Sequence, residues 1–282
     1  MDEKSRLGRG LHDVSRFYLS DSPGEETHGK EPSGDLTLPR QCRVIRVICP
    51  GSALMGAFFT ANFSLELARH RQRVAVFDVS GRDGEGVEAM LREAGHPDPA
   101  SGVLWVRLYG LHDIPVHCPG ADGEAELPER VSESAGHQGD RWAVINTPFC
   151  LGSLAKSPVD SDAVLLSTLD EASLLQCYAC TRVIAQREPQ AGVSLVLIEP
   201  ASDEQARGVF SRFCAFAGER LGVSMGYLGH LLRDDAMESS LSGHRPLVLG
   251  HEPSPARESL AAVCRAFLEQ RRLPDSRDGG RR

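Results

Sequence analysis

The chain has 282 residues, of which 41% are hydrophobic, and a formal net charge of −8 at pH 7. This length suits one large domain with tails, and the apolar content is sufficient for a buried core. The acidic balance argues against broad nucleic-acid binding, which needs a basic face, and the sequence has no apolar run of about 18 residues that would indicate a transmembrane helix.

Residues 1–19 predict a short amphipathic helix. Leu7, Leu11, Val14 and Tyr18 recur at helical spacing, with Phe17 beside them. A helix this short is marginal alone in water and needs a surface to pack on. Either it packs on its own domain or it folds into the groove of a protein partner. We favour the partner, because residues 20–40 are rich in Ser, Gly, Pro and acids and indicate a disordered linker.

Residues 41–271 alternate strand-like and helix-like segments. This alternation predicts a three-layer α/β domain with a mostly parallel central sheet flanked by helices. The first unit, residues 44–78, has an apolar strand, a turn at Pro50 and Gly51, a helix over residues 57–70 and a second strand that ends in Asp78. A strand, a glycine-containing loop and a helix in this order form the phosphate-binding loop of many nucleotide-binding proteins.

The side chains that would hold phosphate are missing from this loop. The motif G-x-x-x-x-G-K-[ST] binds phosphate through backbone N–H groups and a lysine, and binds Mg²⁺ through the hydroxyl. Gly51 and Gly56 keep the glycine spacing, but Ala57 and Phe58 stand where the lysine and the hydroxyl residue belong. Alanine supplies no cation and phenylalanine supplies no oxygen for the metal.

The stretch resembles the MinD/ParA family of deviant-Walker ATPases, in particular its FlhG-like branch, through the helix FFTANFSLELA with its Asn62. Aligned without gaps from Asn62, the family's two lysines fall on Gly51 and Gly56. Aligned on the glycines, they fall on Ser52 and Ala57 instead. Both alignments leave the loop without a lysine, so the resemblance implies a degenerate nucleotide site.

Later segments resemble the family at three further positions and depart from it at each. After Asp78 the family's second switch acid is replaced by Ser80. The strand RWAVINTP resembles the family's Walker B strand, with Asn146 in place of the acid. The asparagine that reads adenine in the family falls on Ile198 or Glu199. The resemblance therefore implies weakened metal binding, hydrolysis and base recognition.

The remaining elements are predicted from their apolar patterns. We expect strands over 103–108, 114–118, 193–198 and 225–229, and helices starting near 84 and spanning 202–221 and 254–270. Cys177 and Cys180 form a lone CxxC within a helical pattern. The simpler interpretation is that they are two thiols one helical turn apart, so no metal site is predicted. Residues 272–282 indicate a disordered basic tail with no apolar face for membrane binding.

These observations leave three hypotheses about function. In the first, the protein is a catalytically inactive MinD/ParA-like pseudo-ATPase, without a cofactor or catalytic residue. It acts as a protein-interaction or regulatory module, by resemblance in cell-pole, flagellar, secretion or envelope machinery of a bacterium. In the second, it is a divergent ATPase that binds ATP and Mg²⁺ with Arg46, Arg69, Arg82 or a partner's residue as the cation. In the third, it is a Rossmann-type binder, which its lack of G-x-G-x-x-G disfavours.

The expected location is the cytoplasm. The N-terminus is polar and charged, unlike a signal peptide, and the eight cysteines are scattered without the spacing of a disulfide or zinc framework. The oligomeric state stays open, since the family's dimers close over two ATP molecules and this chain lacks the residues to hold them.

Overall fold

The computed structural model describes residues 42–79, 86–107, 113–118, 127, 130–131, 141–147 and 161–272. The predicted N-terminal helix with Leu7, Leu11, Val14, Phe17 and Tyr18 lies outside these residues, as do the predicted linker and basic tail. Ser80 and Arg82 also lie outside them. The domain boundaries proposed from the sequence therefore stay predictions.

The described residues form a nine-stranded sheet with the order β3-β4-β5-β2-β6-β1-β7-β8-β9. Strands β2, β6, β1, β7, β8 and β9 are parallel to their neighbours, and β5 is parallel to β2, whereas β4 is antiparallel to both β3 and β5. The strands are β1 Cys42–Ile48, β2 Arg73–Asp78, β3 Gly95–Pro97, β4 Leu104–Val106, β5 Ile114–His117, β6 Arg141–Thr147, β7 Ser161–Ser167, β8 Val193–Ile198 and β9 Met225–Leu231.

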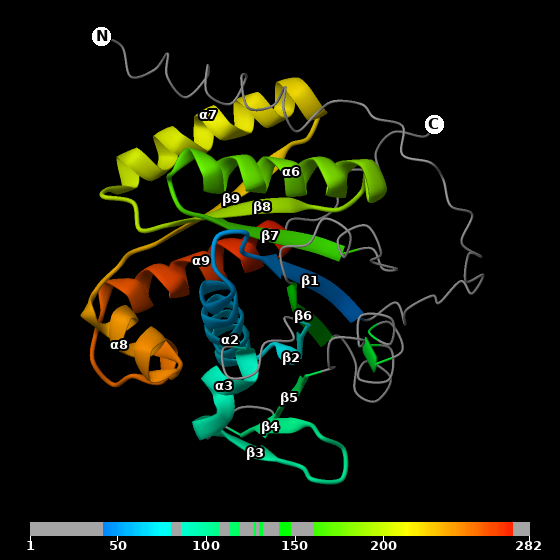
Figure 1. The fold of residues 1–282 in the computed structure, drawn as a ribbon, viewed down its shortest axis with the longest axis vertical. Helices are drawn as coiled ribbons and strands as arrows, with labels where there is room; N and C mark the ends of the chain where they lie inside the picture. Colours follow the sequence, from blue (N-terminus) through cyan, green and yellow to red (C-terminus); the bar gives the residue numbers. More distant parts are fainter. Residues whose placement is uncertain are drawn as a thin grey trace, which may run out of the picture.

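Helices cover both faces of this sheet (Figure 1). Helices α6 and α7 pack over one apolar cluster, and α2, α3, α8 and α9 pack over the other. The predicted three-layer architecture is confirmed. The helices are α2 Ala53–Arg69, α3 Val87–Leu91, α6 Glu171–Arg187, α7 Asp203–Leu221, α8 Asp235–Gly243 and α9 Pro255–Arg272, with short 3-10 turns η1 Arg92–Ala94 and η2 Leu247–Leu249.

Four of the helices begin at a residue whose side chain caps the first turn. Ser52, Asp170, Ser202 and Asp234 each accept a hydrogen bond from the backbone N–H three residues further on. Such a cap satisfies one of the N–H groups that have no partner within the helix. The start of each helix is therefore determined locally by the sequence.

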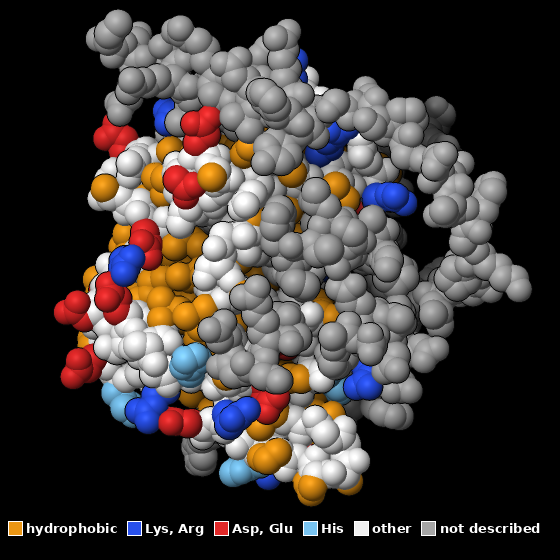
Figure 2. Space-filling view, viewed as in Figure 1, with side chains coloured by type: hydrophobic (Ala, Val, Ile, Leu, Met, Phe, Trp, Pro, Cys, Tyr) orange, Lys and Arg blue, Asp and Glu red, His pale blue; other side chains and the backbone are white. Residues whose placement is uncertain are grey.

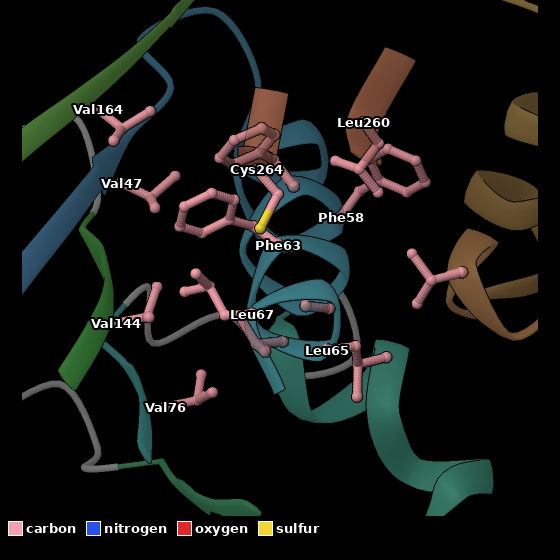
Figure 3. Packing of buried hydrophobic residues seen from close by; sticks show 14 of the residues in the cluster. Val47, Phe58, Phe63, Leu65, Leu67, Val76, Val144, Val164, Leu260 and Cys264 are labelled. Carbon is pink, nitrogen blue, oxygen red and sulfur yellow. The ribbon is translucent and has the colours of Figure 1, made fainter. Parts of the chain in front are cut away.

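Helix α2 lies at the centre of the larger core cluster. Residues 56–68 are buried without interruption, which explains why this helix is apolar on nearly all sides rather than along one stripe. Figure 3 shows its side chains between Val47 and Val144 of the sheet and Leu260 of α9. Phe63 stacks on Phe59 in the same helix at a centroid distance of 5.3 Å.

The structure differs from the sequence-based expectation at the edges of the sheet. Strand β3 was not predicted, because Gly95 and Pro97 have poor intrinsic strand propensity and the strand exists only through its pairing with β4. Strand β4 is shorter than the predicted 103–108, and β9 extends past the predicted end at 229. Within the described residues, no helix is long and apolar enough to cross a lipid bilayer.

Candidate functional site

The connection between β1 and α2 is only four residues long, at positions 49–52. The sequence-based prediction of a loop that continues to Gly56, with the helix starting at Ala57, was wrong: α2 begins at Ala53. Ser52 caps the helix, and the next three residues, Ala53, Leu54 and Met55, all have high helix propensity. Most of the segment expected to wrap around phosphate is therefore the first turn of a helix.

Two backbone N–H groups of this segment, those of Met55 and Gly56, are bound within the chain. The Met55 N–H donates to Ser52 Oγ at 3.2 Å, and the Gly56 N–H donates to the Ser52 carbonyl at 3.0 Å. Burial raises the pKa of the Cys49 thiol to about 11, and backbone hydrogen bonds from Ser52 and Gly51 to this group act in the opposite direction. A phosphate-binding loop needs such N–H groups directed at its ligand.

Ala57 and Phe58 lie in the core rather than beside the loop. Their exposed fractions are 0% and 1%. Figure 3 shows Phe58 near Leu260 of α9, on the side of α2 that faces the helices. The two positions that would carry the lysine and the hydroxyl thus contribute apolar packing.

Asp78 and Asn146 are joined by a hydrogen bond at the ends of β2 and β6. Asn146 Nδ2 donates to Asp78 Oδ1 at 2.9 Å, and the Val87 N–H donates to Asp78 Oδ2 at 2.6 Å. Both side chains are buried. An amide beside a carboxylate needs no cation to be stable, whereas two carboxylates at this separation need a cation or a shared proton. The pair connects the two strands to the start of α3.

Gly56 is required by the same contact. A Cβ at this position would stand 3.1 Å from Asn146 Oδ1 and 3.3 Å from Cys49 Cβ. Both distances are shorter than ordinary van der Waals contact, and the packed core has little room to yield. The glycine retained from the motif thus allows α2 to approach β6 closely.

No protein-family model matches the chain, and no curated protein is similar to it in sequence. Solved structures are similar in fold. A MinC:MinD cell division protein complex from Aquifex aeolicus matches with a TM-score of 0.61 at 15% identity over 80% of this chain and 96% of that chain. The septum site-determining protein MinD with Mg-ADP from Pyrococcus horikoshii matches with a TM-score of 0.55 at 15% identity over 82% and 98%.

A ParA family ATPase from Chlorobium tepidum also matches, with a TM-score of 0.52 at 14% identity over 79% of this chain and 98% of that chain. The chain has the MinD/ParA fold. At these identities the comparison shows the fold alone.

Ile198, the position expected to replace the family's adenine-reading asparagine, is 2% exposed and belongs to the core cluster around α2. The next residue, Glu199, has a left-handed backbone with a φ of 56°. Arg233 lies between two carboxylates, 2.9 Å from Glu199 Oε2 and 2.7 Å from Glu238 Oε1. After β8, the polar side chains of Glu199, Arg233 and Glu238 thus form ion pairs with one another.

Two of the candidate cations of the alternative hypothesis, Arg46 and Arg69, lie away from the loop. Arg46 is 3% exposed, and its Nη2 lies 2.9 Å from Glu188 Oε2. Ile45 and Val47 contact the α2 side of the sheet, so Arg46 points to the opposite face. Arg69 is the last residue of α2, 3.1 Å from Glu66 and about 24 Å along the axis from the helix start. Arg82 lies outside the described residues.

Arg46 is not fully satisfied by its partner. Its Nε and Nη1 are buried and have no hydrogen-bond partner. Burial lowers the pKa of the Arg46 guanidinium, while the nearby Glu188 carboxylate acts to raise it. The ion pair with Glu188 is thus the contact that stabilises the buried positive charge of Arg46.

Asn62, which carried the family resemblance in the sequence, has a structural role here. Its Nδ2 donates to the Phe58 carbonyl at 2.8 Å, and the Val248 N–H donates to its Oδ1 at 3.0 Å. The side chain is completely buried. It therefore fixes η2 against the centre of α2, a contact that sequence spacing could not reveal because the two positions are far apart in the chain.

Cys177 and Cys180 are buried in α6. The Cys177 thiol donates to the Leu166 carbonyl at 3.5 Å, and burial raises the pKa of Cys180 to about 12. Both are protonated thiols at neutral pH. In the described part of the chain, no group of three or more His, Cys, Asp or Glu side chains is placed to hold a metal ion.

Proposed function

We propose that this protein is a MinD/ParA-like pseudo-ATPase that works as a protein-interaction or regulatory module without binding or hydrolysing ATP. The observation that carries the proposal is the β1–α2 connection, where the N–H groups of Met55 and Gly56 are bound by Ser52. A ligand that needed these donors would have to displace the helix cap.

Electrostatics supports the same conclusion. The loop carries no lysine, and Asn146, bonded to Asp78, stands where the resemblance expects the acid that polarises the Mg²⁺ water. Triphosphate placed in a confined site without compensating cations costs several kcal/mol in unpaired charge. Of the three arginines considered as substitutes, Arg46 and Arg69 are paired away from the loop.

A role in protein binding is supported by the surface and by one structural relative. Figure 2 shows hydrophobic side chains gathered between α7 and α8, bordered by acidic and basic side chains. Exposed apolar patches of this kind serve protein contacts. The Aquifex aeolicus relative is a complex of MinD with a protein, MinC. In this chain the predicted helix with Leu7, Leu11 and Val14 is the proposed binding segment for a partner in cell-pole, flagellar, secretion or envelope machinery.

Isothermal titration of the full chain with ATP–Mg²⁺ tests the loss of nucleotide binding. We expect no binding heat at nucleotide concentrations up to about 1 mM, equivalent to a binding free energy weaker than about −4 kcal/mol. Micromolar binding would instead establish the alternative, a divergent ATP-binding protein whose cation comes from Arg82 or a partner.

Affinity capture with the full chain tests the proposed binding role of residues 1–19. Leu11→Asp puts a charge on the apolar stripe of residues 1–19, whereas Ser5→Asp adds the same charge on the opposite side. We expect Leu11→Asp to abolish capture of a partner that both the wild-type chain and Ser5→Asp retain. Equal capture by the two variants would assign the partner to another surface.

A further inference from the structure

Arginines gather at the edge of the sheet where the parallel strands begin. Arg43 of β1 lies over the ring of Trp142, 5.3 Å from its centroid, and the Trp142 indole N–H donates to Gln72 Oε1 at 3.1 Å, next to Arg71 in the chain. Phe267 makes an edge contact with Trp142 at a centroid distance of 5.3 Å, and Arg271 lies over the Phe267 ring. We refer to Arg43, Arg71 and Arg271 as the arginine edge.

The carboxylates near the arginine edge are already paired. Asp162 lies 2.6 Å from Arg271, and Glu66 lies 3.1 Å from Arg69. Across the residues that the structure describes, neither Arg43 nor Arg71 has an ion pair, and both are exposed. Arg43 acts electrostatically on Asp162 without forming an ion pair with it, so the two exposed guanidinium groups are available to a further carboxylate.

Arg71 is also held in an unfavourable backbone conformation. Its φ is 61°, in the left-handed region, at the turn that ends α2. The Arg71 N–H donates to the Ala68 carbonyl at 2.8 Å and the Gln72 N–H to the Leu67 carbonyl at 3.1 Å, a helix ending that normally uses glycine or asparagine. The left-handed turn fixes the backbone of Arg71 at the end of α2, beside the residue that binds Trp142.

The segment that precedes β1 has the complementary charge. Residues 20–39 contain five carboxylates, Asp21, Glu25, Glu26, Glu31 and Asp35, against one lysine, Lys30. The segment ends four residues before Arg43 and is therefore tethered at the arginine edge. A short tether gives an effective concentration in the millimolar range, so even weak ion pairs suffice for docking within one molecule.

We propose that the acidic segment 20–39 of this chain docks on the arginine edge. Docking brings residues 1–19 back towards the domain and restrains them there. The contact is electrostatic and solvent-exposed, so it weakens as ionic strength rises and the screening length falls from about 30 Å at 0.01 M to about 3 Å at 1 M. The segment is thus held at low salt and released at high salt.

Limited digestion by a lysine-specific protease provides the test on the full chain. The sequence has only three lysines, Lys4, Lys30 and Lys156, so cleavage after Lys30 reports on the acidic segment alone. We expect this cleavage to be roughly 3- to 10-fold slower at low salt than at high salt, as two or three exposed ion pairs would give. Cleavage after Lys4 corrects for the effect of salt on the protease.

Variants assign the protection to the arginine edge. Arg43→Gln combined with Arg71→Gln should bring the low-salt rate up to the high-salt rate. The control, Arg212→Gln with Arg265→Gln, removes the same charge from exposed positions on α7 and α9 and should leave the protection intact. Glu25→Gln with Glu26→Gln should match the first variant.

Three outcomes would overturn the proposal. The first is equal Lys30 cleavage rates at low salt in the wild type and the Arg43/Arg71 variant. The second is loss of protection in the control, which would indicate net charge rather than a site. The third is protection that increases with protein concentration, which would make a second copy the occupant. Arg71→Gly serves as a second variant that suits the left-handed turn, should the double variant fail to fold.

Discussion

At position 146 an amide stands 2.9 Å from a carboxylate oxygen of Asp78, inside the protein. A hydrogen bond to a charged group is worth about 1.5–3 kcal/mol, so this contact is a substantial part of the link between β2 and β6. The amide of Asn146 thereby stabilises the ends of β2 and β6 together with Asp78. The family resemblance predicted an acid at this position but could not reveal the hydrogen bond that Asn146 makes, because the bond depends on the register of two strands.

Asn146→Asp should make the protein's stability depend on pH. Two carboxylates at this separation repel, which raises the pKa of the introduced carboxyl in the folded state above its ordinary value near 3.9. A raised folded-state pKa favours folding at low pH and loses that advantage as pH rises through it. We expect a loss of about 2 kcal/mol at pH 7.5 and near recovery at pH 4, measured by urea unfolding.

Asn146→Ala is the matched control, because it removes the hydrogen bond without adding a charge. Its cost should be nearly the same at both pH values. If millimolar Mg²⁺ restored Asn146→Asp at pH 7.5, the position would retain a cation site, and the metal-free account of this residue would be wrong.

Helix α2 shows how far an element can be predicted from its own sequence. Its apolar residues identified it as a buried helix, but its start was placed four residues too late because the glycine spacing was given more weight than the cap. Ser52 and the helix-forming residues after it determine the start. The contact from Asn62 to η2 depends on tertiary packing and could not be inferred locally.

Arg71→Gly should stabilise the end of α2. Glycine adopts a φ near 61° without the steric cost of a side chain, and the capping bonds use only backbone atoms. We expect an increase of about 0.5–1 kcal/mol in the free energy of unfolding, measured by urea titration. Gln72→Gly, at the adjacent position, should destabilise instead, since it removes the acceptor for Trp142.

For the whole molecule, the alternation of strands and helices was sufficient to predict a three-layer fold with a mostly parallel sheet. The parallel strands are long apolar runs whose identity is clear in the sequence. The β3–β4–β5 edge was less legible, because its strands are three to four residues long and depend on each other for pairing. The positions of Ala57 and Phe58 in the core could not be predicted from the sequence either, because they depend on the length of the β1–α2 connection.

The buried thiols make the whole fold sensitive to alkali. Burial raises the pKa of Cys49 to about 11 and of Cys180 to about 12, and raises the pKa of Cys177 and Cys264 as well. Groups with raised folded-state pKa values contribute stability below about pH 9 that is lost as pH rises through the folded values. Each should remove about 1 kcal/mol between pH 8 and pH 10.

Urea unfolding under reducing conditions at the two pH values measures this loss. Cys180→Ala should lower stability at pH 8 through the smaller side chain but reduce the further drop at pH 10 by about 1 kcal/mol. An unchanged drop in this variant would mean that the alkaline sensitivity arises from other groups.

The four-residue connection before α2 also limits how the molecule could ever respond to a phosphate-bearing ligand. Under the proposed function, a ligand that needed the Met55 and Gly56 N–H groups would bind only the minor population in which the first turn is unwound. If unwinding costs about 3 kcal/mol, that population is on the order of 1%, and the apparent affinity is about 100-fold weaker than the intrinsic one. A lysine introduced at position 57 would face the same cost, so building a nucleotide switch into this chain would require a longer loop as well as a new charge.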